Sequence, residues 1–288
     1  MVKAASSKPT ILVLVLSVDR EPWRDIELHG QRITWASPEA IPEGCDVVYY
    51  YGVGGLYRFV GRAAGRLARF GGSNLLSRVV RRVGKNLVER ISRRSSRRPA
   101  VLDGDRLLTR VPDVYKFALP KMISALRWAT APGMPRFDFV YRTNTSSYIS
   151  LTRLQDVAAN MPRRDCYAGF LGLHPTRGYH FASGSGMLLS WDVASRVGST
   201  LTGLNWEKID DEALGELLDT AEITVKPLPR TSVQDVDEVE LLPGDELRTA
   251  FHFRCKSPSE PRTDAAIMLA IHARDRGDRD ADPSRSTL

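Results

Sequence analysis

The chain has 288 residues, with 41 Lys and Arg against 34 Asp and Glu, so its formal net charge is +7. This length accommodates one large domain or two small ones. Hydrophobic residues at 42% and charged residues at 26% are close to the average of soluble proteins, which argues against a disordered, a collagen-like or a membrane-spanning chain.

The basic charge is concentrated in one segment. Between Arg58 and Arg98, thirteen basic residues accompany a single acid, Glu89, which gives this segment a charge of +12. The rest of the chain holds 28 basic and 33 acidic residues, a charge of −5. Because clustered cations attract polyanions, residues 58–98 are the candidate for contact with an acidic surface, a membrane or nucleic acid.

The three cysteines, Cys45, Cys166 and Cys255, are far apart and form no CxxC pair. They predict neither a disulfide framework nor a thiolate zinc site, and a reducing compartment fits them best. The apolar run over residues 11–18 is shorter than the roughly 20 residues of a membrane helix. We therefore expect a cytoplasmic protein.

The first elements in chain order follow a strand, helix, strand pattern. Residues 1–9 are expected to be a flexible lead, and the continuous apolar run over 10–17 predicts a central strand covered on both faces. The run over 46–51 predicts the next strand, and the stretch between has room for a helix. This alternation is typical of the α/β class.

Apolar residues then recur at helical spacing over 56–70 and over 76–91, with arginines on much of the complementary faces. The spacing predicts two amphipathic basic helices that are broken at a pair of glycines. We expect an exposed, flexible loop over 92–99. Together, about residues 56–99 are predicted to be a basic helical insertion in the domain.

The remaining elements continue the alternation of helix and strand. They are a helix over 115–129, a strand over 137–142, a helix over 151–159 with Thr152 and Gln155 at capping-box spacing, a strand, Gly-Ser-Gly turn and strand over 179–190, helices over 191–197 and 211–218, and a strand over 223–225. Residues 274–288 lack apolar periodicity and predict a disordered tail. The domain is therefore expected to span residues 10–273.

Five motifs occur in an order that resembles one group of enzymes. They are Arg32-Ile33-Thr34-Trp35, Asp113-x-Tyr115 followed by Lys121 and Arg127-Trp128, the segment from Tyr141 to Ser146, the segment from Tyr179 to Ser190, and Asp210-Asp211-x-x-x-Gly215. Over about residues 10–225 this order resembles the fringe-like and β-1,3-galactosyltransferase group of inverting glycosyltransferases. The resemblance implies a GT-A-like single domain with a mostly parallel, nucleotide-sugar-binding sheet. It also implies transfer of a sugar from a nucleoside-diphosphate donor to a hydroxyl of a protein, glycan or envelope acceptor.

The sequence departs from that group at the motif Lys-Thr-Asp-x-Asp, whose carboxylates hold Mg²⁺ or Mn²⁺ against the donor diphosphate. Asn144 and Ser146 stand at the two acidic positions, and neither side chain is anionic. Fixed cations or backbone N–H groups can stabilise the leaving diphosphate instead. We therefore expect no required cofactor and no metal ligands, with Mg²⁺ or Mn²⁺ as the alternative.

Candidates for this cationic role lie near the C-terminus. His252, Arg254 and Lys256 alternate, so in an extended segment all three side chains face one side. Arg262 follows after a turn. Guanidinium groups match phosphate geometry, which favours Arg254 as a diphosphate clamp. The alternative is the solvated face of a basic strand.

The resemblance places the catalytic base on Asp211. An inverting transfer needs a group that takes the proton of the acceptor hydroxyl. Asp210 is expected to orient Asp211 or to raise its pKa. The alternative is that both are the acidic first turn that any helix favours.

Further donor contacts are expected where strands end and where glycines admit close approach. The alternatives for these positions are ordinary turns and helix caps. The predicted donor-binding residues are Ser17, Asp19, Arg142, Asn144, Thr145, Ser146, Gly184, Ser185, Gly186, His252, Arg254 and Lys256.

Three functions are therefore open. The first is the glycosyltransferase, and the second is a degenerate relative that binds sugars or anions without turnover. The third is a nucleic-acid or membrane-surface protein that acts through residues 58–98, where few aromatic residues make nucleic acid the less favoured partner. The sequence predicts neither a membrane anchor nor paired cysteines. We therefore expect a bacterial or phage protein that lies in the cytoplasm, and contact with a membrane surface is the alternative.

Overall fold

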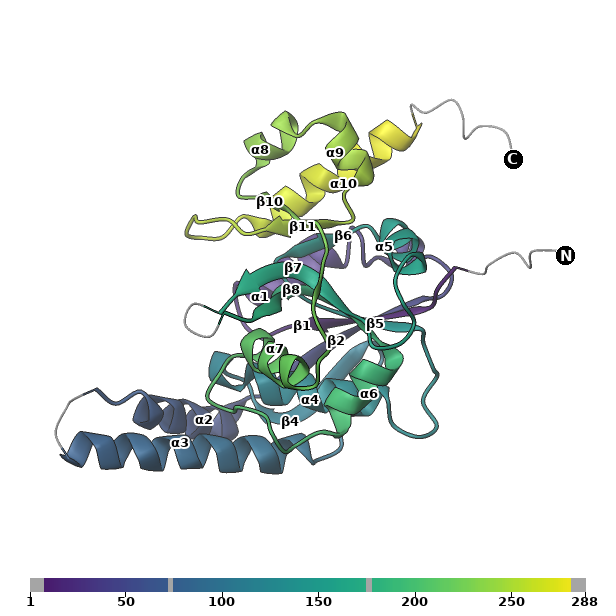
Figure 1. Ribbon diagram of the computed structural model, residues 1–288. Coiled ribbons are helices and arrows are strands. Elements are labelled where there is room, and N and C mark those ends of the chain that lie inside the picture. The colour runs from purple at the N-terminus through teal and green to yellow at the C-terminus, as the bar shows by residue number, and fades with distance from the viewer. Residues whose placement is uncertain (1–7, 72–74, 175–177, 281–288) are drawn as a thin grey trace, which may run out of the picture.

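The computed structural model of the chain describes residues 8–71, 75–174 and 178–280, and at its centre is an eight-stranded sheet flanked by helices (Figure 1). The strands lie side by side in the order β3-β4-β2-β1-β5-β8-β7-β9. Along the chain they are β1 (Ile11–Leu16), β2 (Cys45–Val53), β3 (Val101–Asp103), β4 (Arg106–Pro112), β5 (Phe139–Asn144), β7 (Tyr167–Leu173), β8 (His180–Ser190) and β9 (Lys226–Pro227). The α/β class expected from the sequence is confirmed.

The central strands β4, β2, β1 and β5 are parallel, whereas β8 runs antiparallel to both of its neighbours. β1 is buried along nearly its whole length, which explains why its sequence is continuously apolar rather than alternating. The strands predicted over 10–17, 46–51 and 137–142 are confirmed as β1, β2 and β5. Their parallel alignment brings the carboxyl ends to one edge of the sheet.

Two hydrophobic cores lie on the two faces of the sheet. On one face pack α4 (Ala118–Ala129), α6 (Trp191–Ser199) and α7 (Asp210–Thr220). On the other pack α1 (Trp23–Ile26), the π-helical η1 (Glu27–Gln31), α5 (Leu151–Ala159) and a small second sheet. Short 3-10 turns, η2 (Pro38–Ala40) and η3 (Tyr115–Phe117), complete the connections.

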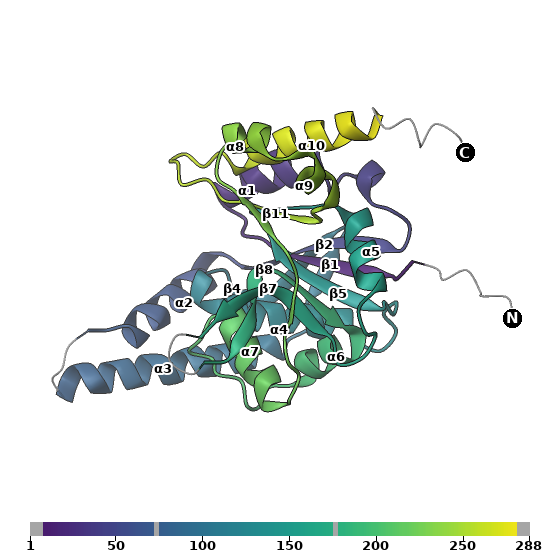
Figure 2. The same ribbon diagram turned by 45° about the horizontal axis from the view of Figure 1, so that its top comes forward.

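The second sheet has the order β10-β11-β6 and forms an outer layer with three helices (Figure 2). Its strands are β6 (Ser147–Ile149), β10 (Thr231–Val233) and β11 (His252–Cys255), and its helices are α8 (Val236–Leu241), α9 (Gly244–Thr249) and α10 (Asp264–Asp280). β6 follows β5 after a two-residue turn, so β11 lies directly beside the edge at which β5 ends.

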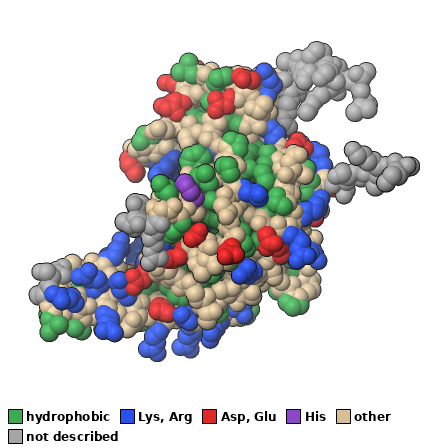
Figure 3. All heavy atoms as spheres, in the orientation of Figure 1, with side chains coloured by type: hydrophobic (Ala, Val, Ile, Leu, Met, Phe, Trp, Pro, Cys, Tyr) green, Lys and Arg blue, Asp and Glu red, His purple; other side chains and the backbone are tan. Residues whose placement is uncertain are grey.

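The two predicted basic helices are confirmed as α2 (Gly55–Ala68) and α3 (Leu75–Ser96), which pair as an arm that projects from the sheet (Figure 1). Lys and Arg side chains gather along this arm, and hydrophobic ones lie at its end (Figure 3). The prediction of a flexible loop over 92–99 is wrong for residues 92–96, because α3 continues to Ser96. Ser95 and Ser96 are buried, and their hydroxyls donate to carbonyl oxygens one turn back.

Other sequence predictions are corrected by the structure. Residues 179–190 contain no turn, because Gly186 continues the pairing of β8 with β5. The strand predicted over 223–225 lies a few residues later, at β9. The capping box predicted for α5 is not formed, because the Gln155 side chain donates to the carbonyl oxygens of Pro9 and Glu43. β3, β4 and β7 were not predicted.

The tail predicted over 274–288 is wrong for residues 274–280, which belong to α10. Arg274 anchors this helix by donating to the carbonyl oxygens of Glu240 and Leu242. The rest of that tail and the first seven residues of the predicted lead lie outside the described residues. Across the described ranges, no helix has both the length and the apolar character that crossing a membrane requires.

Candidate active site

The predicted polar residues meet at the carboxyl edge of the parallel strands. Leu16, which ends β1, lies opposite Asn144, which ends β5. Because β8 runs antiparallel to β5, its middle reaches the same edge, with Gly186 opposite Thr143. The first residue of α7, Asp210, also contacts β5 here through an ion pair.

That ion pair joins Arg142 of β5 to Asp210, and both side chains are almost fully buried. The other guanidinium nitrogens donate to the Tyr50 hydroxyl, at 3.0 Å from Nε, and to the Gly184 carbonyl. Each nitrogen of Arg142 therefore has a protein partner. The predicted donor contact of Arg142 is corrected to a positioning role, in which it holds Asp210 and Gly184.

Asp211 directs its carboxylate at the backbone of β8. The Gly184 N–H donates to Oδ2 at 2.8 Å, and the Glu212 N–H donates to Oδ1 at 2.9 Å. Burial, and then the neighbouring Asp210 carboxylate, raise the pKa of Asp211 above its ordinary value. A carboxylate with a raised pKa accepts a proton more readily, as a general base requires.

The glycines of β8 permit this close packing. A Cβ at Gly184 would lie 2.8 Å from Arg142 Nη1 and 3.2 Å from Asp211 Oδ2. A Cβ at Gly186 would overlap the Tyr141 hydroxyl. The space that these glycines leave open is therefore occupied by protein side chains of β5, β11 and α7, and their predicted contact with a donor sugar stays a prediction.

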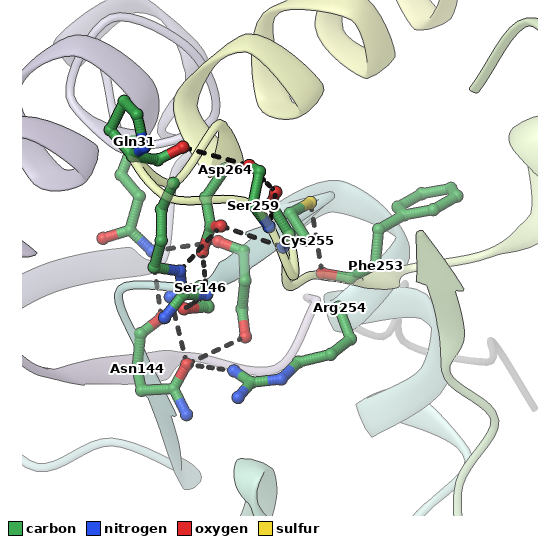
Figure 4. A network of polar contacts seen from close by, with 12 residues as sticks. Gln31, Asn144, Ser146, Phe253, Arg254, Cys255, Ser259 and Asp264 are labelled. Carbon is green, nitrogen blue, oxygen red and sulfur yellow. Dashed lines mark hydrogen bonds and ion pairs between the residues drawn. The ribbon is translucent and has the colours of Figure 1, made fainter. Parts of the chain in front are cut away.

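Asn144 links the carboxylate to a cationic group. Its Nδ2 donates to the Gly184 carbonyl at 3.1 Å, and its Oδ1 accepts from Arg254 Nη1 at 2.5 Å (Figure 4). Because the Gly184 N–H donates to Asp211, a continuous series of contacts runs from Asp211 through Gly184 and Asn144 to Arg254.

Three arginines from different segments converge at the cationic end of this series. Arg262 Nη2 donates to Ser146 Oγ at 3.1 Å, and Arg230 Nη1 donates to Ser185 Oγ at 2.8 Å. Burial and the positive charges of Arg230 and Arg262 lower the pKa of Arg254 to about 10. Arg254 therefore lies close enough to Arg230 and to Arg262 to be repelled by both charges, and an anion bound beside it would relieve that repulsion.

Arg230 is absent from the predicted set. It lies in the link between β9 and β10, and its main sequence signal is the preceding Pro-Leu-Pro, which favours an extended segment. Its guanidinium lies 3.9 Å from the Phe170 ring centroid, and burial lowers its pKa. Arg262 is paired with Asp264, but no carboxylate in the described ranges pairs with Arg230 or Arg254.

His252 does not contribute the predicted cation. It is buried between the Tyr141 hydroxyl, 3.1 Å from Nδ1, and the Ser147 hydroxyl, 3.2 Å from Nε2. Burial, with the charges of nearby arginines, lowers the pKa of His252 well below its ordinary value, so the ring is neutral. Lys256 lies exposed just beyond the end of β11, so the predicted row of three cations is corrected at His252, and the donor contact of Lys256 stays a prediction.

A cavity of about 200 Å³ lies at the same edge, beside the end of β1, and Asp19, Tyr51 and Arg106 contribute to its lining. Asp19 is exposed there, as a ligand contact requires. Ser17 is buried and its hydroxyl donates to Glu27 at 2.5 Å, so its predicted contact with a donor is corrected. The predicted residue Thr145 is buried in the turn after β5.

Comparison with known proteins yields no match, either to a protein-family model or to a curated protein. Within residues 8–71, 75–174 and 178–280, no three His, Cys, Asp or Glu side chains are grouped so as to hold a metal ion. The fold and the site define an α/β protein with a partly buried carboxylate and clustered arginines at the carboxyl edge of its sheet.

Proposed function

We propose that the protein is an inverting glycosyltransferase with a GT-A-like fold that uses a nucleoside-diphosphate sugar. The observation that carries the proposal is the series of contacts from Asp211 to Arg254, because it joins a candidate base to a cationic group at one edge of the sheet. The arrangement of the large sheet between two layers of helices is consistent with this fold.

In the proposed reaction, Asp211 accepts the proton of an acceptor hydroxyl while that oxygen bonds to the anomeric carbon of the donor. The bond from this carbon to the diphosphate oxygen breaks, and its electron pair leaves with the diphosphate. Attack from the face opposite the leaving group inverts the anomeric centre. Asp210 assists by raising the pKa of Asp211, and Arg142 assists by holding Asp210.

The charge that develops on the leaving diphosphate is assigned to Arg254 and Arg230. Both guanidinium groups contact neutral oxygen atoms, of Asn144 and Ser185, and so keep their charge for a ligand. Guanidinium donors match phosphate oxygens in geometry. Cations held in place before the reaction stabilise developing charge without reorganisation.

The residues at positions 144 and 146 do not fit a divalent cation. Asn144 Oδ1 accepts from Arg254, and Ser146 Oγ accepts from Arg262, so both oxygen atoms already face guanidinium groups. Mg²⁺ and Mn²⁺ prefer carboxylate ligands, and two adjacent positive charges would repel them. The proposed transfer is therefore independent of metal.

The cavity beside Asp19 is the proposed place of the nucleoside. The Asp19 carboxylate is 4.0 Å from Arg24 and 3.8 Å from Arg106, so both pairs are loose and leave its oxygens able to accept from ribose hydroxyls. The ring of Tyr51 adds apolar surface to the lining.

Release of nucleoside diphosphate from a panel of nucleotide sugars tests the role of Asp211. We expect release from one donor, with water as the acceptor, and a loss of about 10²- to 10⁴-fold in Asp211→Asn, as for removal of a general base. Asp219→Asn, an exposed aspartate on the same helix, is the matched control and should keep full activity. Undiminished release in Asp211→Asn would move the base elsewhere.

A donor-binding protein without turnover is the second candidate, and the neutral residues at 144 and 146 favour it. It predicts that calorimetry detects nucleotide-sugar binding, weakened by Arg254→Gln, while no donor in the panel releases diphosphate. Turnover of any donor would reject it.

A further inference from the structure

The arm formed by α2 and α3 exposes large apolar side chains toward its end, away from the body. The two helices approach most closely at Gly84, where a Cβ would overlap the backbone of Ala68, and Ala64, Ala68 and Val88 are buried in the part of the arm nearer the body. Leu75 and Leu76, at the start of α3, are 76% and 69% exposed. The apolar surface of the arm is therefore not consumed by packing of the arm on itself.

This apolar surface is continuous at the end of the arm. Leu76, Val79 and Val83 are separated by three and four residues, so they share one face of α3, and all three are exposed. The same face continues toward the body with exposed Arg90 and Arg94. One stripe of the helix is thus apolar at the end and basic nearer the sheet.

The corresponding end of α2 repeats this combination. Leu67 and Phe70 are exposed there, at 37% and 50%, and Arg62 and Arg66 are exposed on the same helix. Figure 3 shows hydrophobic side chains at the end of the arm and cationic ones along it. The arm coincides with most of residues 58–98, the segment of charge +12, whereas the rest of the chain has a charge of −5.

We propose that the end of this arm docks on the surface of an anionic membrane. Its leucine, valine and phenylalanine side chains enter the boundary between headgroups and acyl chains, and the arginines bind the lipid phosphates. Apolar residues beside cations are the features that hold a helix at such an interface. A nucleic-acid backbone would use the cations alone and would leave the apolar stripe in water.

The position of the arm links this contact to the candidate active site. α2 starts two residues after β2, whose carboxyl end lies at the same sheet edge as Asn144. Arg58 near the start of α2 pairs with buried Asp113 at 3.1 Å, which fixes the base of the arm to the body. Docking therefore holds the sheet edge at a set distance from the membrane.

Sedimentation of the full chain with vesicles tests the proposal, without any donor sugar, so its outcome is independent of the glycosyltransferase activity. We expect binding to vesicles of phosphatidylcholine with phosphatidylglycerol and none to phosphatidylcholine alone. Arg62→Gln with Arg66→Gln and Arg82→Gln should weaken binding about fivefold per arginine. The exposed arginines Arg20, Arg136 and Arg164, changed in the same way, are the matched control.

Insertion is separated from simple charge attraction by a second pair of variants. Leu76→Glu with Val79→Glu should weaken vesicle binding at least roughly tenfold, whereas Leu173→Glu with Leu241→Glu, at exposed sites on the body, should leave it unchanged. Unchanged binding in the Leu76 and Val79 variant would overturn the proposal. Failure to bind anionic vesicles, or tighter binding to duplex DNA at equal salt, would also overturn it.

Discussion

At the scale of single residues, the surroundings of Asp211 make its carboxyl group a weaker acid. Burial and the nearby Asp210 carboxylate raise its pKa, so the ionised form is less favourable in the folded chain than in the unfolded chain. Below the ordinary value of 3.8 both states are protonated and the effect on stability vanishes. As the pH rises through the window above 3.8, the folded state loses stability, and this loss persists at neutral pH.

Asp211→Asn should therefore increase stability while it lowers turnover. We expect the free energy of unfolding to rise by about 1 kcal/mol near pH 7, because the variant lacks the unfavourable charge of the carboxylate. The gain should disappear by about pH 3, where the carboxyl group of the parent is protonated. Urea unfolding across this pH range measures the difference. A variant less stable than the parent at neutral pH would show that the carboxylate stabilises the fold instead.

Gly184→Ala tests the contact between β8 and the two functional side chains. The new Cβ would press against Arg142 and Asp211, so we expect roughly a 10²-fold loss in diphosphate release with a modest loss of stability. Gly277→Ala is the matched control, because a Cβ there meets no atom within 4 Å. Equal activity in the two variants would contradict the proposed positioning.

Asn144, Asp211 and Arg254 could be predicted because each lies in a motif or in a short alternating run. The contacts between these three residues could not be predicted from the sequence, because they depend on the pairing of β8 with β5 and of β11 with β6. Arg230 lies in an irregular link with no periodicity, so sequence reasoning missed it. The burial of Arg142 likewise follows from packing of α7, which spacing along the chain does not reveal.

At the scale of elements, a buried charge cluster joins the base of the arm to α4 and to the end of β4. Asp113 accepts from Lys121 and from Arg58, both at 3.1 Å, and the Asp113 and Lys121 side chains are almost fully buried. Burial lowers the pKa of Lys121, and the Asp113 charge opposes this shift.

Asp113→Asn should destabilise the protein by about 3 kcal/mol, because it leaves the Lys121 ammonium buried without a carboxylate. Adding Lys121→Met should recover part of the loss, and urea unfolding measures both. Asp156→Asn is the control, since its pair with Lys8 is exposed and should contribute at most about 0.5 kcal/mol. If Asp113→Asn lowered the free energy of unfolding as little as the control does, water or other groups would have to compensate the buried charge of Lys121.

The arm shows how far periodicity alone reaches. Helical spacing predicted both basic helices, but it assigned the apolar residues no partner. The structure shows a close approach of the helices at Gly84 and Ala68, partial burial of the stripe near the body at Leu87 and Ile91, and exposure of its larger residues toward the end of the arm. The serine-rich segment after Ile91 was predicted as a loop, because side-chain hydroxyls that bond back to the helix leave no periodic signal.

At the scale of the whole molecule, the net charge of +7 is the balance of a basic arm and an acidic body. The central α/β sheet could be predicted from its apolar runs, since parallel strands buried on both faces have continuous apolar sequences. The outer layer of β10, β11 and α8 to α10 could not, because its strands have three or four residues and its helices α8 and α9 only six. This layer nevertheless supplies Arg254 and Arg262 to the site.

The most direct test of metal-free diphosphate stabilisation is release of nucleoside diphosphate from the donor panel with and without EDTA, in the parent chain and in Arg230→Gln with Arg254→Gln. Metal-free transfer predicts that the parent releases diphosphate equally under both conditions and that the double variant loses roughly 10²-fold or more. Loss of the parent's activity in EDTA, restored by Mn²⁺ or Mg²⁺, would contradict it, as would full activity in the double variant.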